Sequence, residues 1–193
     1  MPSSNEIVRG TLGAVKFLQR DPSAPSHFEN TTEYCLRSFR VMLVVAPIYG
    51  LYLAVYYSSV SVQADELEIF CVETLRYIVD WLLYPVIFYE IARRRNWLDR
   101  YPRYIAALNW TNLPAVVVAL GGLTLALLAP PSFATIIDLA LRGLFFYWFM
   151  MVTRMVLGVS WLFTALLTVV NWIPSLFLSL IVTRFLGVTP LPG

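Results

Sequence analysis

The chain is short of the side chains that most catalytic and metal sites need. Its 193 residues include one histidine, His27, and two cysteines, Cys35 and Cys71. The two cysteines form neither a CxxC pair nor another metal-ligand spacing. Glycine-rich phosphate loops, nucleophile elbows and HExxH helices are missing as well. We therefore expect no catalytic residue, no metal ion and no cofactor.

Charge is scarce too. Charged residues make up 13% of the chain and hydrophobic residues 59%, whereas soluble domains carry about 25% charged residues. So little polar surface cannot cover a water-soluble globule, which indicates a membrane protein. The net charge of +2 gives no reason to expect nucleic acid as a partner. Residues 1–40 lack the short apolar core of a signal peptide, so we expect this segment to be retained.

Apolar runs occupy five stretches, at residues 41–58, 77–92, 104–128, 133–156 and 161–185. A membrane-spanning helix needs about 20 residues, so the short second run is expected to belong to a longer helix that begins near Leu67. The predicted fold class is all-α, a polytopic bundle of five transmembrane helices over residues 31–186. Residues 187–193 are expected to form a short tail with nothing to pair with.

Residues 1–30 form a separate amphipathic or cytoplasmic segment in this interpretation. One face of a helix over residues 5–20 would carry Ile7, Thr11, Ala14, Val15 and Leu18. This pattern is typical of a helix lying on a membrane surface, and it fits equally well a helix packed on its own domain. The pair Asn30 and Glu33 predicts a capping box that starts the next helix near Thr31.

Arginine and lysine alternate with the apolar runs. They gather before the first run and after the second, Arg154 stands at the end of the fourth, and the loops after the first and third runs have none. Arg184, near the outer end of the fifth run, is the one exception. The positive-inside rule then places the N-terminus in the cytoplasm and the C-terminus outside. Of the 14 basic residues all except Lys16 are arginine, a bias that favours a GC-rich bacterial genome and hence the bacterial inner membrane.

The loop after the second run is the richest in arginine. It is expected to contact anionic lipid on the cytoplasmic side, or a membrane-protein partner or second copy of the chain. A solvated loop without a partner is the alternative. The candidate contact residues are Arg93, Arg94, Arg95, Arg100 and Arg103.

Three ionisable residues, Asp80, Asp138 and Arg142, fall inside the predicted spans, where each needs a partner or a polar cavity. A helical rise of ~1.5 Å per residue places Asp80 and Arg142 at similar depths, roughly 20 Å and 18 Å from the inner boundary. We predict that Arg142 is shared between Asp138 and Asp80 and joins the second and fourth spans. A proton or ion pathway through these residues is the alternative.

Three asparagines lie close to prolines in the third and fifth spans: Asn109 and Asn112 near Pro114, and Asn171 near Pro174. The favoured interpretation is hydrogen bonding between helices. The alternative is a binding cavity between broken helices.

The layout resembles the Yip-type (Ypt-interacting protein) family of five-span membrane proteins, in its uncharacterised bacterial branch. The resemblance lies in FENTTEYCLRSF at residues 28–39, in Asn109-Trp110, and in Tyr147-Trp148 followed by Arg154. The family implies five spans, a cytoplasmic N-terminus and no enzymatic activity. The chain lacks the family's long N-terminal region with its DLYGP-like motif, so a small-GTPase partner is not implied.

The function expected from these features is a non-catalytic scaffold or accessory subunit of a membrane complex. A small transporter or channel component that uses the intramembrane polar groups is the alternative. An intramembrane enzyme is a third possibility that no motif supports.

Overall fold

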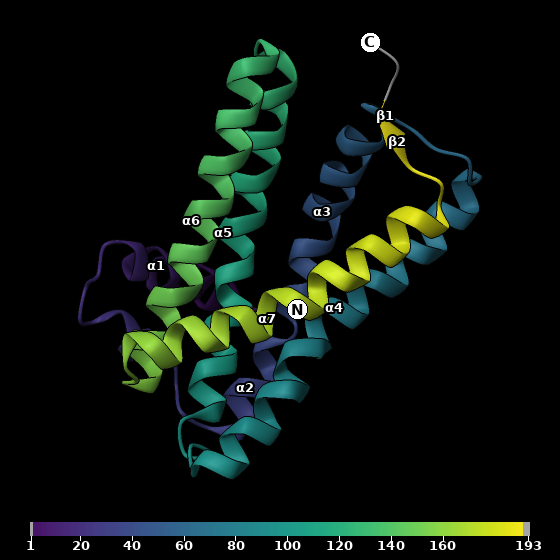
Figure 1. The fold of residues 1–193 in the computed structure, drawn as a ribbon. Coiled ribbons are helices and arrows are strands. Elements are labelled where there is room, and N and C mark those ends of the chain that lie inside the picture. Colours follow the sequence, from purple (N-terminus) through teal and green to yellow (C-terminus); the bar gives the residue numbers. More distant parts are fainter. Residues whose placement is uncertain (1, 191–193) are drawn as a thin grey trace.

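The computed structural model describes residues 2–190, and most of them are helical (Figure 1). The helices are α1 (Ser4–Leu18), the 3-10 helix η1 (Ala24–His27), α2 (Thr32–Ser38), α3 (Val41–Tyr57), α4 (Glu66–Arg95), α5 (Tyr101–Leu128), α6 (Pro131–Leu157) and α7 (Trp161–Phe185). Two short strands, β1 (Val60–Ser61) and β2 (Thr189–Pro190), complete the structure. The predicted all-α class is confirmed.

Four helical stretches are long and apolar enough to cross a membrane: Thr32–Tyr57, which joins α2 and α3, and the helices α5, α6 and α7. The chain therefore has the character of an integral membrane protein. Helix α4, with 30 residues, is about 45 Å long at the usual helical rise, but its many charged residues keep it out of this group. It begins at Glu66, one residue from the predicted start, because the Asp65 side chain accepts a hydrogen bond from the Glu68 N–H at 2.8 Å. The count of five spans remains a prediction.

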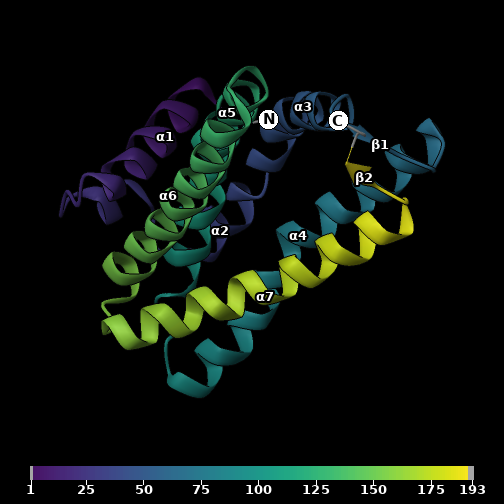
Figure 2. The same ribbon diagram turned by 45° about the horizontal axis from the view of Figure 1, so that its top comes forward.

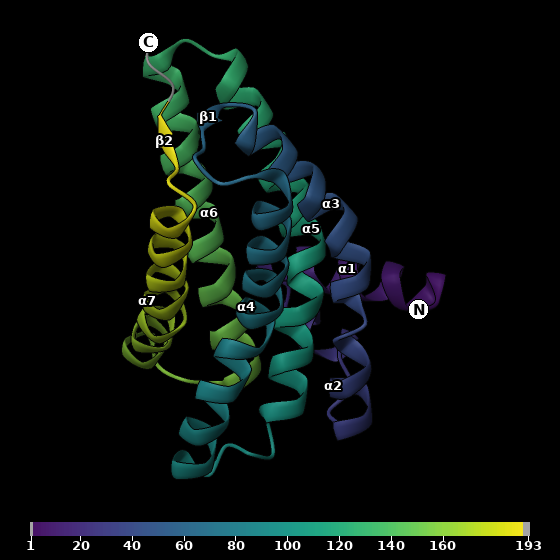
Figure 3. The ribbon, with the colours of Figure 1, turned by 90° about the vertical axis from the view of Figure 1, so that its right-hand side faces the viewer.

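The long helices form two groups. Helices α5 and α6 make an antiparallel hairpin, and α3 packs on α5. Helices α4 and α7 lie side by side in antiparallel directions and diverge from the hairpin toward the end of the molecule that carries β1 and β2 (Figures 1 and 2). The α5–α6 turn lies at that same end, while α2 and the α4–α5 loop lie at the opposite end (Figure 3).

Helix α1 is packed on α5 and α6. Glycine allows the close approach, because a Cβ added at Gly10 would lie 2.2 Å from the Trp110 ring. The Trp148 indole N–H donates to the Ala14 carbonyl at 2.8 Å. The buried residues of α1 include Gly13, Ala14 and Phe17. The buried face is therefore rotated about the helix axis relative to the apolar face predicted from the sequence. The structure thus has the helix packed on its own domain, and its position at a membrane surface remains a prediction.

Two local predictions are wrong. The tail does find a partner, because β2 pairs antiparallel with β1 and the Leu186 carbonyl accepts from the N–H groups of Gln63 and Ala64 at 3.2 and 3.3 Å. Residues 191–193 of the predicted tail lie outside the described part of the chain. The cap of α2 is Thr31, whose side chain accepts from the Tyr34 N–H at 3.2 Å.

Asn30, the predicted cap, serves another purpose. Its side-chain amide donates to the Asp99 carbonyl at 2.6 Å and accepts from the Arg103 N–H at 3.2 Å. Asn30 therefore ties the segment before α2 to the α4–α5 loop, a contact between distant parts of the sequence that local capping rules do not anticipate.

Candidate functional site

A cavity of about 460 Å³ lies between the two groups of long helices. Side chains from α3, α4, α5, α6 and α7 line it, most of them apolar or aromatic. Its polar lining residues are Arg76 and Asp80 from α4, Asn109, Thr111 and Asn112 from α5, and Asn171 and Ser175 from α7. Four of the six intramembrane polar candidates, namely Asp80, Asn109, Asn112 and Asn171, therefore meet in one place.

Beside the cavity, α4 carries a buried acid with three hydrogen-bond donors. Glu73 is 3% exposed. Its Oε1 accepts from the Tyr57 hydroxyl at 2.6 Å and from Arg76 Nη1 at 3.2 Å, and its Oε2 accepts from the Tyr49 hydroxyl at 3.3 Å. Both tyrosines come from α3, so Glu73 joins α3 to α4. A buried carboxylate with several donors is a satisfied structural group.

Asp80 lies one turn beyond Arg76 on the same face of α4, since residues four apart are neighbours on a helix. Arg76 Nε is 3.7 Å from Asp80 Oδ2, too long for a hydrogen bond, and the Ser175 hydroxyl of α7 donates to Asp80 Oδ1 at 3.1 Å. The Asp80 side chain keeps 33% of its surface exposed and Arg76 keeps 20%. Within residues 2–190, Asp80 is thus held by one hydrogen bond, and its side chain lines the cavity.

The three asparagines differ in their partners. Asn109 is buried, and its side-chain amide donates to the Ser38 hydroxyl of α2 at 2.9 Å, which agrees with the favoured interpretation of a bond between helices. For Asn112 and Asn171 the described part of the chain provides no side-chain hydrogen bond, and both line the cavity. Helices α5 and α7 continue through Pro114 and Pro174, so the cavity lies between continuous helices rather than broken ones.

Aromatic rings form much of the cavity wall. The Tyr49 and Tyr77 rings are stacked with centroids 5.0 Å apart, and the Trp81 ring meets Tyr77 edge-on at 6.0 Å. Toward the α4–α5 loop, the hydroxyl of the buried Tyr104 is 2.8 Å from both the Tyr84 hydroxyl and the Thr153 hydroxyl. This hydrogen-bonded group joins α4, α5 and α6.

The predicted link between Arg142 and Asp80 is wrong. Arg142 Nε donates to Asp138 Oδ2 at 2.7 Å, and the two side chains are 58% and 59% exposed. Neither residue lines the cavity. The estimate of depth did not resolve which way each side chain points around its helix, and here the partners of Asp80 are Arg76 and Ser175 instead.

The arginines of the α4–α5 region have different surroundings. Arg93 and Arg94 are exposed and pair with Glu90 at 2.9 and 2.6 Å, and the Arg95 guanidinium lies 4.9 Å from the centre of the Phe163 ring. Arg100 donates to the Leu157 carbonyl at 2.5 Å and Arg103 to the Phe28 carbonyl at 3.1 Å. The last two connect elements of the fold, which leaves Arg93 and Arg94 as the more accessible of the five for lipid or a partner.

Sequence reasoning missed Tyr49, Tyr57 and Ser175, which bond to the acids of α4. Ser175 carries no signal of its own, although it follows Pro174 directly. Tyr57 stands at the end of α3, where an aromatic residue is typical of a membrane interface. The face of α4 that carries Glu73, Arg76 and Asp80 can be found from the helical period alone.

Comparison with protein-family models, with curated proteins and with solved structures finds no match for this chain.

Proposed function

We propose that this protein is a small transporter or channel component that uses the polar cavity between α3, α4, α5, α6 and α7 to bind its substrate. The observation that carries the proposal is the set of incompletely bonded polar side chains around that cavity. Asp80 has one hydrogen bond, and Asn112 and Asn171 have no partner within the described chain. Polar groups within the bilayer are costly unless they meet a partner or line a cavity.

The proposal includes a fifth span. Helix α4 runs beside α7, one of the four apolar helices, and most of its charged residues lie near its two ends. Its N-terminal turns carry acidic residues only, and its last turn carries Arg93, Arg94 and Arg95. With α4 counted, the chain ends lie on opposite sides, the N-terminus in the cytoplasm and the C-terminus outside, and the positive-inside rule supports this orientation.

Cysteine labelling in intact cells tests the topology. A background without native thiols, Cys35→Ser with Cys71→Ser, would receive single cysteines at Ser59, Asp99, Val159 and Val188. An impermeant maleimide is expected to label positions 59 and 188 from outside, and positions 99 and 159 only after lysis. Labelling of positions 59 and 99 from the same side contradicts α4 as a span.

The cavity itself is tested by substitution of its free amides. Asn112→Leu with Asn171→Leu removes polar groups that hold no other part of the protein, so the fold is expected to persist and substrate binding or flux to fall. Asn109→Leu is the contrasting variant, because its bond to Ser38 makes it structural and its main effect should be on stability. Unchanged binding or flux in the double variant argues against the cavity as the site.

A second candidate function is a non-catalytic scaffold or accessory subunit, in line with the Yip-type layout. Helix α7 favours it, because apolar side chains along much of its length are exposed in the isolated chain, among them Leu162, Leu166, Ile173, Phe177 and Ile181. Lipid covers such a face as well as a partner protein does. Purification in mild detergent separates the two candidates, since a stoichiometric membrane-protein partner supports the accessory role and a solitary chain or homo-oligomer supports the transporter.

A further inference from the structure

We infer that the cavity takes an amphiphilic organic ammonium ion, with the Asp80 carboxylate as its counter-ion. The inference rests on the proposed function, because it names the class of substrate for the same cavity. It follows from three separate properties of the lining residues: their charge, their free hydrogen-bonding capacity and their aromatic surface.

The charge of the site is unbalanced. Glu73 and Asp80 are two carboxylates, and Arg76 lies between them as the one cation that pairs with either within the described chain. The guanidinium is closer to Glu73, at 3.2 Å, than to Asp80, at 3.7 Å. Glu73 is enclosed by its donors, so the excess negative charge resides on Asp80, which is the carboxylate that lines the cavity. A cationic ligand is attracted to this site, and an anion meets two carboxylates beside the single arginine.

The free hydrogen-bonding capacity favours a ligand with N–H donors. An ionised carboxylate offers about four acceptor positions, and the one hydrogen bond that Asp80 accepts comes from Ser175. The side-chain oxygens of Asn112 and Asn171 are further acceptors from α5 and α7. A primary or secondary ammonium group can donate to Asp80 and to one of these amides together.

The walls fit an apolar or aromatic body attached to that ammonium. Tyr49, Tyr77, Trp81 and Trp172 all line the cavity, and an ammonium close to such a ring face is stabilised electrostatically. The volume of about 460 Å³ falls within the range of about 300–1,000 Å³ found for small-molecule sites. A transmembrane helix, about 10–12 Å across with its side chains, is too large for it. The ligand is therefore a small molecule or a single lipid headgroup.

The experiment uses three probes that share a phenyl ring and a similar length but differ in the polar end: 4-phenylbutylamine, 4-phenylbutanol and 4-phenylbutyrate. Binding to the full chain in phosphatidylcholine nanodiscs would be measured by saturation-transfer NMR, with empty nanodiscs to correct for partition into lipid. We expect the amine to bind about tenfold or more tightly than the alcohol, as a charge-assisted hydrogen bond implies. The carboxylate should bind most weakly.

Asp80→Asn keeps the shape of the side chain and is expected to remove the preference for the amine. Asp138→Asn is the matched control, because Asp138 is also in a predicted span but does not line the cavity. This variant should keep the preference for the amine over the alcohol. If Asp80→Asn does not yield folded protein, Asn112→Leu with Asn171→Leu provides the test, and it should weaken amine binding. An undiminished amine preference in Asp80→Asn overturns the inference, and so does undiminished amine binding in the double asparagine variant.

The outcomes separate this inference from the proposed function. Equal binding of amine and alcohol to the unmodified chain, abolished together by the double asparagine variant, leaves a binding cavity and overturns the ammonium preference. No binding of any probe overturns both. Nanodiscs that include phosphatidylethanolamine identify the source of the ammonium. Competition between this lipid and the amine indicates a lipid headgroup, and its absence indicates a free amine; both results support an ammonium site.

Discussion

Two helices of this protein carry an acid and a base at the same spacing, and the two pairs have different surroundings. On α4, Arg76 precedes Asp80 by four residues and joins the buried Glu73. On α6, Asp138 precedes Arg142 by four residues, and both side chains are more than half exposed. Spacing along a helix thus determines which charges can pair, while the packing of neighbouring helices determines whether the pair is isolated from its surroundings.

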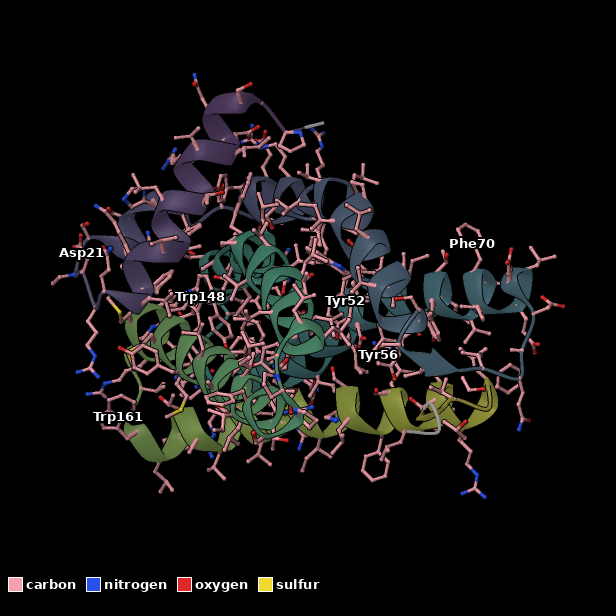
Figure 4. The ribbon with its side chains drawn as sticks, turned by 90° about the horizontal axis from the view of Figure 1, so that it is seen from above. Asp21, Tyr52, Tyr56, Phe70, Trp148 and Trp161 are labelled. Atoms are coloured by element: carbon pink, nitrogen blue, oxygen red, sulfur yellow. The ribbon has the colours of Figure 1, made fainter. Side chains whose placement is uncertain are left out.

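The difference arises from what packs beside each helix. Two tyrosines of α3 and a serine of α7 reach the acids of α4, and no side chain of another helix bonds to the α6 pair within the described chain. In the view from above, Tyr52 and Tyr56 lie on α3 within the same cluster of helices, whereas Phe70 at the start of α4 points away from it (Figure 4). Substitution of the buried acid of α4, Glu73, and of the exposed acid of α6, Asp138, therefore tests whether burial has the energetic consequence that we infer.

The largest effect is expected from Glu73→Gln. This change removes the acid that lies closest to Arg76 and leaves a buried guanidinium with only the more distant Asp80. Removal of one member of a buried ion pair typically costs about 3–5 kcal/mol. Reversible unfolding of the chain in bicelles, measured by steric trapping, should show a loss of stability in this range. If the loss of stability is only as large as that for an exposed ion pair, water or lipid reaches Glu73 freely.

A smaller effect is expected from Tyr57→Phe, which deletes the 2.6 Å hydrogen bond to Glu73 and keeps the ring. Hydrogen bonds to a charged group contribute about 1.5–3 kcal/mol. Tyr49→Phe is the matched variant, and its weaker bond of 3.3 Å should make its loss the smaller one in the same unfolding measurement. The opposite ranking contradicts the assignment of Tyr57 as the main donor from α3.

Asp138→Asn is expected to change stability by less than either substitution at Glu73 or Tyr57. Exposed ion pairs contribute about 0.2–1 kcal/mol. The double variant Asp138→Asn with Arg142→Gln should lose no more than the single variant, since the partner is removed along with the acid. A single loss as large as that of Glu73→Gln means that lipid or another molecule shields this face of α6 from water.

The helices could be predicted from the sequence, and the contacts between them could not. Apolar length predicts α5, α6 and α7 because a spanning helix satisfies its own backbone hydrogen bonds, so its existence depends on local sequence. The face of α4 with Glu73, Arg76 and Asp80 follows from the helical period. Arg76, four residues before Asp80, follows from that period as one partner, whereas the other partner, Ser175, depends on how α4 and α7 are rotated and how they cross, which no local pattern encodes. Arg142 therefore looked like a suitable partner at the right depth, and Ser175, a residue without charge, holds that position.

The smallest effect concerns an acid in the loop after α1. Asp21 lies at the edge of the molecule (Figure 4), accepts a 2.8 Å hydrogen bond from the Ser23 N–H and pairs with Lys16 at 3.3 Å. The Ser23 backbone hydrogen bond, the main cause, lowers the pKa of Asp21 below its usual value of 3.8. A carboxylate whose pKa is lower in the folded state stabilises the fold above its unfolded pKa, and this contribution is lost as the pH falls through the folded pKa.

Thermal unfolding should therefore show a small stability difference between the unmodified chain and Asp21→Asn at pH 7, and this difference should shrink toward pH 3. A difference that persists unchanged at low pH shows that the charge of Asp21 has no part in it, and that the loop after α1 is stabilised by the shape of the side chain alone.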